Sequence, residues 1–202
     1  MNKKIIKDAL ILTAFTLVLG FLLGIVYEVT KEPIAKVNYE KQQNAFKQVF
    51  SNADKFEAVE FDKEEALTLM EENGFKDSID DVQAALDTSG DVLGYVITVT
   101  AKDGSQGTIT FSVGIQNDGT VNGYSITSIS ETPGLGMKAK TDEKFYGQFE
   151  NMNVDSFVVV KQETTKDGEI EAISGSTITS KAMANGCNAA ICYFNTKLEG
   201  GE

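Results

Sequence analysis

VLGYVITVTA (residues 92–101), GTITFSVGIQ (107–116) and TVNGYSITSI (120–129) are the three stretches that decide the fold. Each is rich in valine, isoleucine and threonine, and its apolar residues roughly alternate with polar ones, as in half-buried β-strands. The stretches are separated by Lys-Asp-Gly-Ser (102–105) and Asn-Asp-Gly (117–119), which are typical of hairpin turns. Three successive strands joined by short turns predict an antiparallel meander.

Helical patterns flank this meander on both sides. Apolar residues recur with helical spacing over residues 34–50, and a shorter helix over 62–72 has Asp62 as a candidate N-cap and Gly74 as a stop signal. The pattern predicts an α+β fold, in which helices pack against one antiparallel sheet. The other expected elements are helices at 142–151 and 179–195 and a strand at 156–162.

The N-terminal part of the chain has the composition of a membrane anchor. Residues 9–27 read ALILTAFTLVLGFLLGIVY and contain no charge. At about 1.5 Å per residue, this stretch matches a hydrocarbon core of about 30 Å. The preceding lysines, Lys3, Lys4 and Lys7, predict a cytoplasmic N-terminus. A cleaved signal peptide is the alternative, but the apolar stretch is long and no Ala-x-Ala-type cleavage site follows it.

The anchor divides the chain into four predicted parts. Pro33 is expected to mark the exit from the membrane segment, because the residue before a proline resists helical geometry. We expect a cytoplasmic leader at 1–8, a single transmembrane anchor at 9–27, a juxtamembrane linker helix at 28–50 and an extracytoplasmic domain at 51–202. The predicted location is the cytoplasmic (inner) membrane.

Composition excludes several classes of function. The formal net charge is −12, with +1 on the first thirty residues, so the outer domain is acidic and unsuited to nucleic acid. The chain has no histidine, which excludes Ser-His-Asp and Cys-His catalysis and the usual haem and zinc ligands. It also has no arginine, so a phosphate must be held by lysine, by backbone N–H groups or by a covalent bond.

The two cysteines, Cys187 and Cys192, are five residues apart in a predicted helix. On a helix this spacing points the side chains in different directions, which disfavours a disulfide. Two thiols are also too few for an iron–sulfur cluster. We expect both to be free.

Ser-Gly-Ser-Thr-Ile-Thr-Ser (174–180) precedes the last predicted helix and is dominated by hydroxyl groups. Hydroxyls beside the free N–H groups and the positive dipole of a helix N-terminus are typical of a phosphate site. The alternative is a helix cap alone, with Thr179 or Ser180 as the N-cap residue.

Glu-Thr-Pro-Gly-Leu-Gly (131–136) follows the third strand of the meander. Pro133-Gly134 is a turn pair, and Gly134 and Gly136 allow backbone to approach a flat ligand while Leu135 offers an apolar face. The alternative is an ordinary glycine-rich connection.

Together, these two segments resemble the FMN-binding domain of the G subunits of Rnf electron-transport complexes. The same domain occurs in the C subunit of Na+-translocating NADH:quinone reductase. In that family a flavin transferase recognises Asp-x-x-Ser/Thr-Gly-Ala-Thr and attaches FMN to the final threonine through a phosphoester. Ser174 and Gly175 match this signature and the acceptor falls on Thr177, whereas Glu171 replaces the Asp and Ser176 replaces the Ala. Ser176 and Thr179 remain alternative acceptors.

The resemblance implies a set of cofactor-binding residues. The loop 131–136 is expected to line the isoalloxazine ring, and Lys138 is the candidate cation near the flavin or its phosphate. Thr177 is expected to carry the covalent FMN. The expected site residues are Glu131, Thr132, Gly134, Leu135, Gly136, Lys138, Ser174, Gly175, Ser176, Thr177, Thr179 and Ser180.

The function implied by the resemblance is electron transfer by a membrane-anchored subunit that is not catalytic alone. The flavin carries the redox chemistry, while the protein sets its position and potential. Its partners would be the other subunits of a complex that moves electrons between ferredoxin and NAD and transports Na+ or H+, and a flavin transferase for maturation. The alternatives are a flavin-free extracytoplasmic binding module and a flavin domain that serves an extracellular reductase.

Overall fold

The structure is a computed structural model that describes residues 3–162 and 164–199. It divides into two compact units, residues 1–41 and residues 42–202. The ends of two predicted parts, residues 1–2 of the leader and 200–202 of the outer domain, lie outside the described residues.

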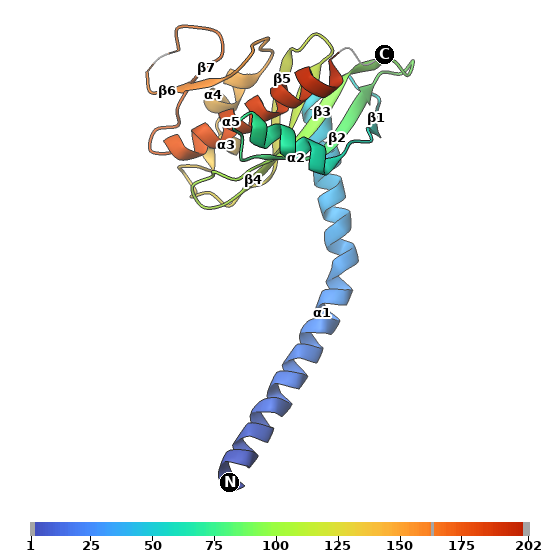
Figure 1. The fold of residues 1–202 in the computed structure, drawn as a ribbon, viewed down its shortest axis with the longest axis vertical. Helices are drawn as coiled ribbons and strands as arrows, with labels where there is room; N and C mark the ends of the chain where they lie inside the picture. Colours follow the sequence, from blue (N-terminus) through green and yellow to red (C-terminus); the bar gives the residue numbers. More distant parts are fainter. Residues whose placement is uncertain (1–2, 163, 200–202) are drawn as a thin grey trace. The chain divides into compact units, whose positions relative to one another are not determined.

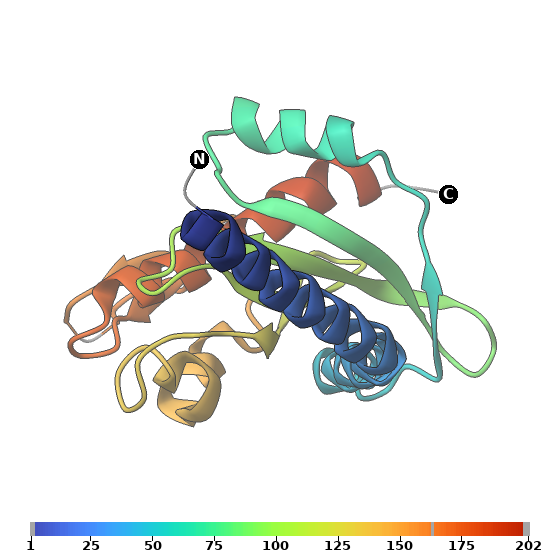
Figure 2. The same cartoon turned by 90° about the horizontal axis from the view of Figure 1, so that it is seen from below.

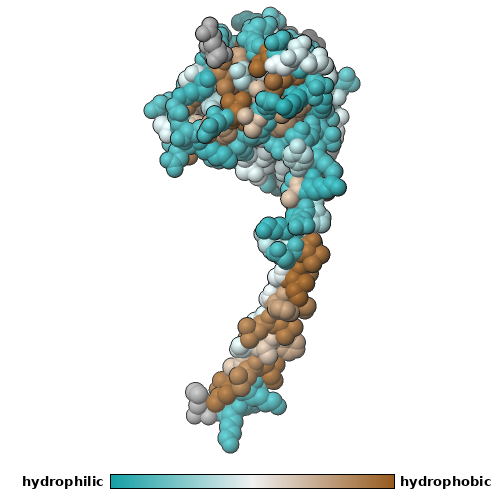
Figure 3. All heavy atoms as spheres, turned by 90° about the vertical axis from the view of Figure 1, so that its right-hand side faces the viewer, coloured by the Kyte–Doolittle hydropathy of each residue, from teal (hydrophilic) through white to brown (hydrophobic). Residues whose placement is uncertain are grey.

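Helix α1 (Lys3–Val49) is a continuous α-helix that runs through Pro33. Pro33 therefore does not interrupt the helix, and its place as the exit from the membrane stays a prediction. Proline removes one backbone donor at a cost of about 3 kcal/mol, and the helical residues on both sides maintain the helix across it. Among the described residues, α1 is the one helix long and apolar enough to cross a membrane. Figure 3 shows the hydrophobic surface of its predicted membrane segment.

The second unit is built on a five-stranded antiparallel sheet in the order β1-β2-β3-β4-β5 (Figure 1). The three predicted strands are confirmed and form the β3-β4-β5 meander. Strands β1 and β2 precede it and were not predicted. The bounds are β1 (Lys55–Ala58), β2 (Ser78–Leu86), β3 (Val92–Ala101), β4 (Ile109–Gln116) and β5 (Val121–Ser128).

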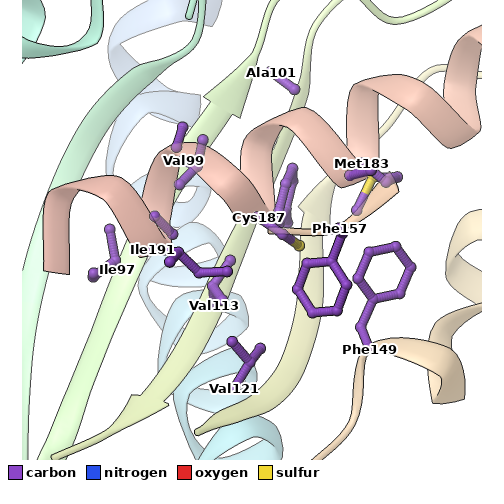
Figure 4. Packing of buried hydrophobic residues seen from close by; sticks show 14 of the residues in the cluster. Ile97, Val99, Ala101, Val113, Val121, Phe149, Phe157, Met183, Cys187 and Ile191 are labelled. Atoms are coloured by element: carbon purple, nitrogen blue, oxygen red, sulfur yellow. The ribbon is translucent and has the colours of Figure 1, made fainter. Parts of the chain in front are cut away.

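Helices α2 (Lys63–Glu72) and α5 (Thr177–Tyr193) cover one face of this sheet (Figure 2). Asp62 caps α2 as predicted, because its side chain accepts hydrogen bonds from the N–H groups of Glu64 and Glu65. The main core lies between α5 and the sheet (Figure 4). Its fully buried members include Ile97, Val99, Phe111, Val113, Phe149, Met183 and Cys187.

The last two turns of α1 cover the opposite face of the sheet and belong to the second unit. Phe46 and Val49 of α1 pack with Val96 of β3 in a smaller apolar cluster. Gly114 of β4 makes this close approach possible, since a Cβ there would lie 2.8 Å from the Val49 carbonyl oxygen. The sheet is therefore covered on both faces.

The connections around the sheet differ in part from the predictions. The expected helix at 142–151 is two short pieces, α4 (Glu143–Tyr146) and a 3-10 turn, η1 (Gly147–Phe149). Phe145 and Phe149 of these two pieces both pack in the aromatic part of the core. The predicted strand at 156–162 is confirmed as β6 (Val158–Val160), which pairs in parallel with β7 (Glu169–Glu171). The other elements are α3 (Lys138–Thr141) and a π-helical turn, η2 (Phe194–Leu198).

Both cysteines are free, as predicted. Cys187 is fully buried under the sheet, and Cys192 is half-buried one turn further along α5. Burial raises the pKa of each thiol, most strongly for Cys187. These thiols are core residues of low reactivity.

Candidate functional site

The loop after β5 and the start of α5 meet around one cavity. Its volume is about 330 Å³, which is within the range of ligand pockets, roughly 300–1,000 Å³. The loop supplies its glycine-rich segment, and the helix supplies its hydroxyl-rich first turn. The lining residues are Ser105, Glu131, Thr132, Leu135, Gly136, Gly175, Ser176, Thr177, Ile178 and Thr179.

Gly136 stands at the closest approach of the two segments. A Cβ at this position would lie 2.6 Å from Glu131 Oε2 and 2.8 Å from Thr179 Oγ1. Both distances are shorter than an ordinary van der Waals contact, so any side chain at this position would have to displace Glu131 or Thr179. The absent side chain is what keeps this part of the cavity open.

The N-terminus of α5 faces this cavity without a side-chain cap. Ser176 occupies the N-cap position, yet its hydroxyl makes no capping hydrogen bond. Among the described residues, no acceptor is found for the N–H groups of Thr177, Ile178 and Thr179. A serine at this position ordinarily satisfies one of these donors. Three free amides at the positive end of a 17-residue helix are suited to binding an anion.

Thr179 provides an independent sign of a missing ligand. Its hydroxyl oxygen is buried and has no hydrogen-bond partner among the described residues. Buried polar atoms are nearly always paired, and an unpaired one costs about 1–3 kcal/mol. Because Thr179 lines the cavity, a polar group placed there would satisfy it.

Glu131 is buried beside Thr179, and its carboxylate already accepts hydrogen bonds from the protein. Its Oε1 accepts hydrogen bonds from Ser105 N at 2.6 Å and Gln106 N at 3.2 Å. The carboxylate therefore holds the loop between β3 and β4, which supplies Ser105 to the lining. The predicted four-residue turn at this place is in fact a longer loop, because β4 begins only at Ile109.

The structure brings together most of the predicted site residues. Glu131, Thr132, Leu135, Gly136, Gly175, Ser176, Thr177 and Thr179 all line the cavity. Four predicted residues, Gly134, Lys138, Ser174 and Ser180, are not among the lining residues, and their roles stay predictions. Ser180 is fully buried, and its hydroxyl donates to Ser176 O and accepts from Ile173 N.

The first turn of α5 also corrects the cap prediction. The helix begins at Thr177, two residues earlier than expected, so neither Thr179 nor Ser180 is the N-cap residue.

Ile178 and Ser105 line the cavity and were not predicted from the sequence. Ile178 follows the acceptor candidate directly and its 60% exposure is unusual for isoleucine, but the sequence pattern had no means of showing that exposure.

Family models match the chain in two places. The N-terminal region of RnfG matches residues 1–49, and the FMN-binding domain matches residues 104–192, which include the whole cavity. The G subunit of an ion-translocating oxidoreductase complex from Methanosarcina acetivorans is 32% identical over 97% of both chains. The chain belongs to the G-subunit family of Rnf-type complexes. The G subunit of the Na+-translocating ferredoxin:NAD+ oxidoreductase complex from Acetobacterium woodii is 34% identical over 95% of this chain and 92% of its own.

A solved structure supports the fold. The C subunit of the Na+-translocating NADH-quinone reductase from Parabacteroides distasonis has a TM-score of 0.50 and 19% identity. The match covers 74% of this chain and 80% of that chain. The expected α+β FMN-binding fold with an N-terminal apolar helix is thereby confirmed.

The cavity fits the phosphate end of FMN on chemical grounds. The free amides of α5 suit an anionic phosphate, and the unpartnered Thr179 hydroxyl suits a polar atom of the ligand. The exposed apolar side chains of Leu135 and Ile178 flank the opening and suit an aromatic ring. The residues present therefore match the group that the FMN-binding domain implies.

Proposed function

We propose that this protein is a membrane-anchored electron-transfer subunit that carries FMN covalently on Thr177. It serves an ion-translocating ferredoxin:NAD oxidoreductase complex and is not catalytic by itself. The observation that carries the proposal is the uncapped N-terminus of α5, which faces a cavity beside the half-buried Thr177. The family membership supports the same function.

Accessibility selects Thr177 among the hydroxyls of the segment. Thr179 and Ser180 are fully buried, and Ser176 is only 8% exposed. Thr177 is half-buried and lines the cavity, so its oxygen can be reached while the attached group enters the site. Ser174 is exposed but does not line the cavity. Modification at Thr177 would bring the phosphate close to the first turn of α5.

The attachment step follows ordinary phosphoryl chemistry. The Thr177 oxygen bonds to the phosphorus of an activated flavin dinucleotide, whose pyrophosphate bond breaks. The hydroxyl proton leaves, and a nucleoside monophosphate is released. A flavin transferase supplies this catalysis, because the chain has no histidine to act as the base.

Each part of the site has a separate task once FMN is attached. The α5 amides would hold the phosphate, Leu135 and Ile178 would offer apolar contacts to the ring, and Thr179 would provide a buried hydrogen-bonding group. The flavin accepts and donates electrons when bound. A covalent bond compensates for the absence of arginine, since the chain has no guanidinium group to retain the phosphate.

The proposed partners are the other subunits of the complex. The relatives are named as subunits of ion-translocating complexes, with Na+ as the ion in Acetobacterium woodii and the proton in Clostridium ljungdahlii. The proposal covers both ions. The acidic charge of the outer domain argues against nucleic acid as a partner.

The proposed topology has the N-terminus in the cytoplasm and the flavin domain outside. The three lysines before the apolar stretch support it. Fusing alkaline phosphatase, which folds only outside the cytoplasm, to the C-terminus tests this orientation. An active fusion is expected; an inactive phosphatase beside a fluorescent cytoplasmic reporter fusion would reverse the topology.

Mass spectrometry tests the covalent site. The full chain is produced together with a flavin transferase and digested, and the mass of the peptide holding residues 174–181 is measured. We expect the added mass of FMN minus water in the wild type and in Ser176→Ala, but not in Thr177→Ala. An unmodified wild-type peptide would favour the flavin-free binding module instead.

A further inference from the structure

The loop between β3 and β4 (102–108) is tied down by two buried carboxylates. Asp77 Oδ1 accepts a hydrogen bond from Lys102 N at 3.2 Å, at the beginning of the loop. Glu131 Oε1 accepts the two hydrogen bonds from Ser105 and Gln106 at its centre. Asp77 and Glu131 are 3% and 5% exposed. Buried carboxylates of this kind need such donors, so loop and carboxylates stabilise one another.

Gly104 allows the backbone of this loop to approach Glu131 closely. A Cβ at Gly104 would lie 2.1 Å from Gly107 O and 3.1 Å from Glu131 Oε1. No side chain fits there without displacing loop backbone. Gly104 thus lets the following N–H groups converge on the carboxylate.

The position of Ser105 connects this loop to the cavity. Ser105 lines the cavity together with Gly136 and the first turn of α5. The rest of the loop is largely exposed, so few apolar contacts hold it in place. The hydrogen bonds to Glu131 are therefore its main attachment at this end.

We propose that Glu131 is a positioning residue that holds loop 102–108 as one wall of the cavity. Glu131 acts on the ligand through the loop, and its Oε1 is engaged by backbone N–H groups. The loop-holding role depends only on the hydrogen bonds described above. Its consequence for flavin loading rests on the proposed function.

Limited proteolysis of the unloaded full chain in detergent measures the loop directly. Lys102 is exposed, and trypsin cuts after it only when the loop opens. Glu131→Gln exchanges charge-assisted bonds for neutral ones, which we expect to raise the cleavage rate at Lys102 roughly tenfold. Gly104→Ala should do the same from the loop side, with Glu131 intact.

Glu72→Gln is the matched control, because Glu72 is exposed on α2 and its side chain makes no hydrogen bond among the described residues. Cleavage at Lys102 should be unchanged in this variant. The rate of cleavage elsewhere in the chain, followed in the same digests, identifies any variant that has unfolded as a whole. Cleavage of Glu131→Gln at the control rate would overturn the proposal.

Flavin loading by the transferase is the second measurement. We expect Glu131→Gln and Gly104→Ala to load more slowly than the wild type, and the double variant to be no worse than the slower single variant. Slower loading of Glu131→Gln with unchanged cleavage at Lys102 would mean that Glu131 contacts the flavin itself, which also contradicts the proposal. Failure of the wild type to load would reject the proposed function. The loop-holding role of Glu131 would then still be tested by the proteolysis alone.

Discussion

Gly136 and Thr179 face each other so closely that a Cβ on Gly136 would lie 2.8 Å from Thr179 Oγ1. The two residues come from segments 43 positions apart, one after β5 and the other in α5. Their contact fixes the loop 131–136 against the first turn of the helix. It also leaves the Thr179 hydroxyl beside open space, because glycine offers it no partner.

Gly136→Ala is predicted to block flavin loading while the fold is kept. The new methyl group must displace either Glu131 or Thr179, and overpacking of this kind costs about 1–3 kcal/mol. We expect loading to fall by about tenfold or more and the melting temperature to drop by several degrees. Absorbance of the covalent flavin and thermal unfolding measure the two effects.

Gly147→Ala is the control for that variant. Gly147 has a φ of −63°, and no neighbouring atom lies within 4 Å of the position that a Cβ would take, so alanine fits there. Loading and melting temperature should both stay close to the wild-type values. Equal loading in both variants would show that the space beside Gly136 is not needed.

Gly186→Ala is predicted to weaken the packing of α5 on the sheet. A Cβ there would lie 2.5 Å from Cζ of Phe111, which is a fully buried ring. Although alanine favours a helix by about 1 kcal/mol over glycine, the overlap outweighs this gain and should lower stability by about 1–3 kcal/mol. Denaturant unfolding of the full chain in detergent checks the sign. A more stable variant would mean that Phe111 rotates away freely.

The buried Asp77 is predicted to make stability depend on pH. Burial raises the pKa of this carboxyl above its ordinary value of 3.8, and the Lys102 amide offsets only part of the effect. A group whose pKa is higher in the folded state binds its proton more tightly there. Its contribution to stability is therefore present at low pH and is lost as the pH rises through the folded-state pKa.

Asp77→Asn tests this dependence, because asparagine can still accept the hydrogen bond from Lys102 N. The asparagine side chain does not titrate. The free energy of unfolding of the variant, relative to that of the wild type, should therefore increase as the pH rises from about 4 to 7. Unfolding curves at several pH values give the difference. A difference that stays constant over this range would contradict the raised pKa.

The two thiols are predicted to react with N-ethylmaleimide at very different rates. Burial, and to a smaller extent the charge of Asp77, raise the pKa of Cys187, which is fully buried. Cys192 is half-buried, and its pKa is raised less. Since the thiolate is the reactive form, Cys192 should be labelled slowly and Cys187 only after unfolding. Peptide mapping after native and denatured labelling distinguishes them.

The sequence was sufficient to predict the meander, because the alternation in residues 92–129 is strong and its turns are typical. Strand β2 was missed for a physical reason. Its register shifts between Ile79 and Asp81, and this irregularity interrupts the alternation of apolar residues. The two acidic residues that it carries, Asp80 and Asp81, are paired by side chains from other segments, which no local pattern reveals. Strand β1 is an exposed edge and has almost no apolar signal.

The site was predicted where its residues are adjacent in sequence and missed where only folding brings them together. The two segments 131–136 and 174–180 were recognisable from glycine and hydroxyl content. Ser105 was not, because its place in the cavity depends on hydrogen bonds to Glu131, 26 residues away. The start of α5 was misplaced because Ser176 takes the N-cap position without making the usual cap, and local propensity does not show this.

The uncapped start of α5 has a consequence for the life of the protein in the cell. Under the proposed function, the phosphate end of a flavin gives partners to the three free amides and to the Thr179 hydroxyl, so loading stabilises the folded chain. Under the proposed attachment to Thr177, the covalent bond makes that gain permanent. Newly made copies without flavin should therefore unfold and be degraded more often than mature ones. Quality control would then remove copies that cannot carry electrons before they occupy a place in the assembly.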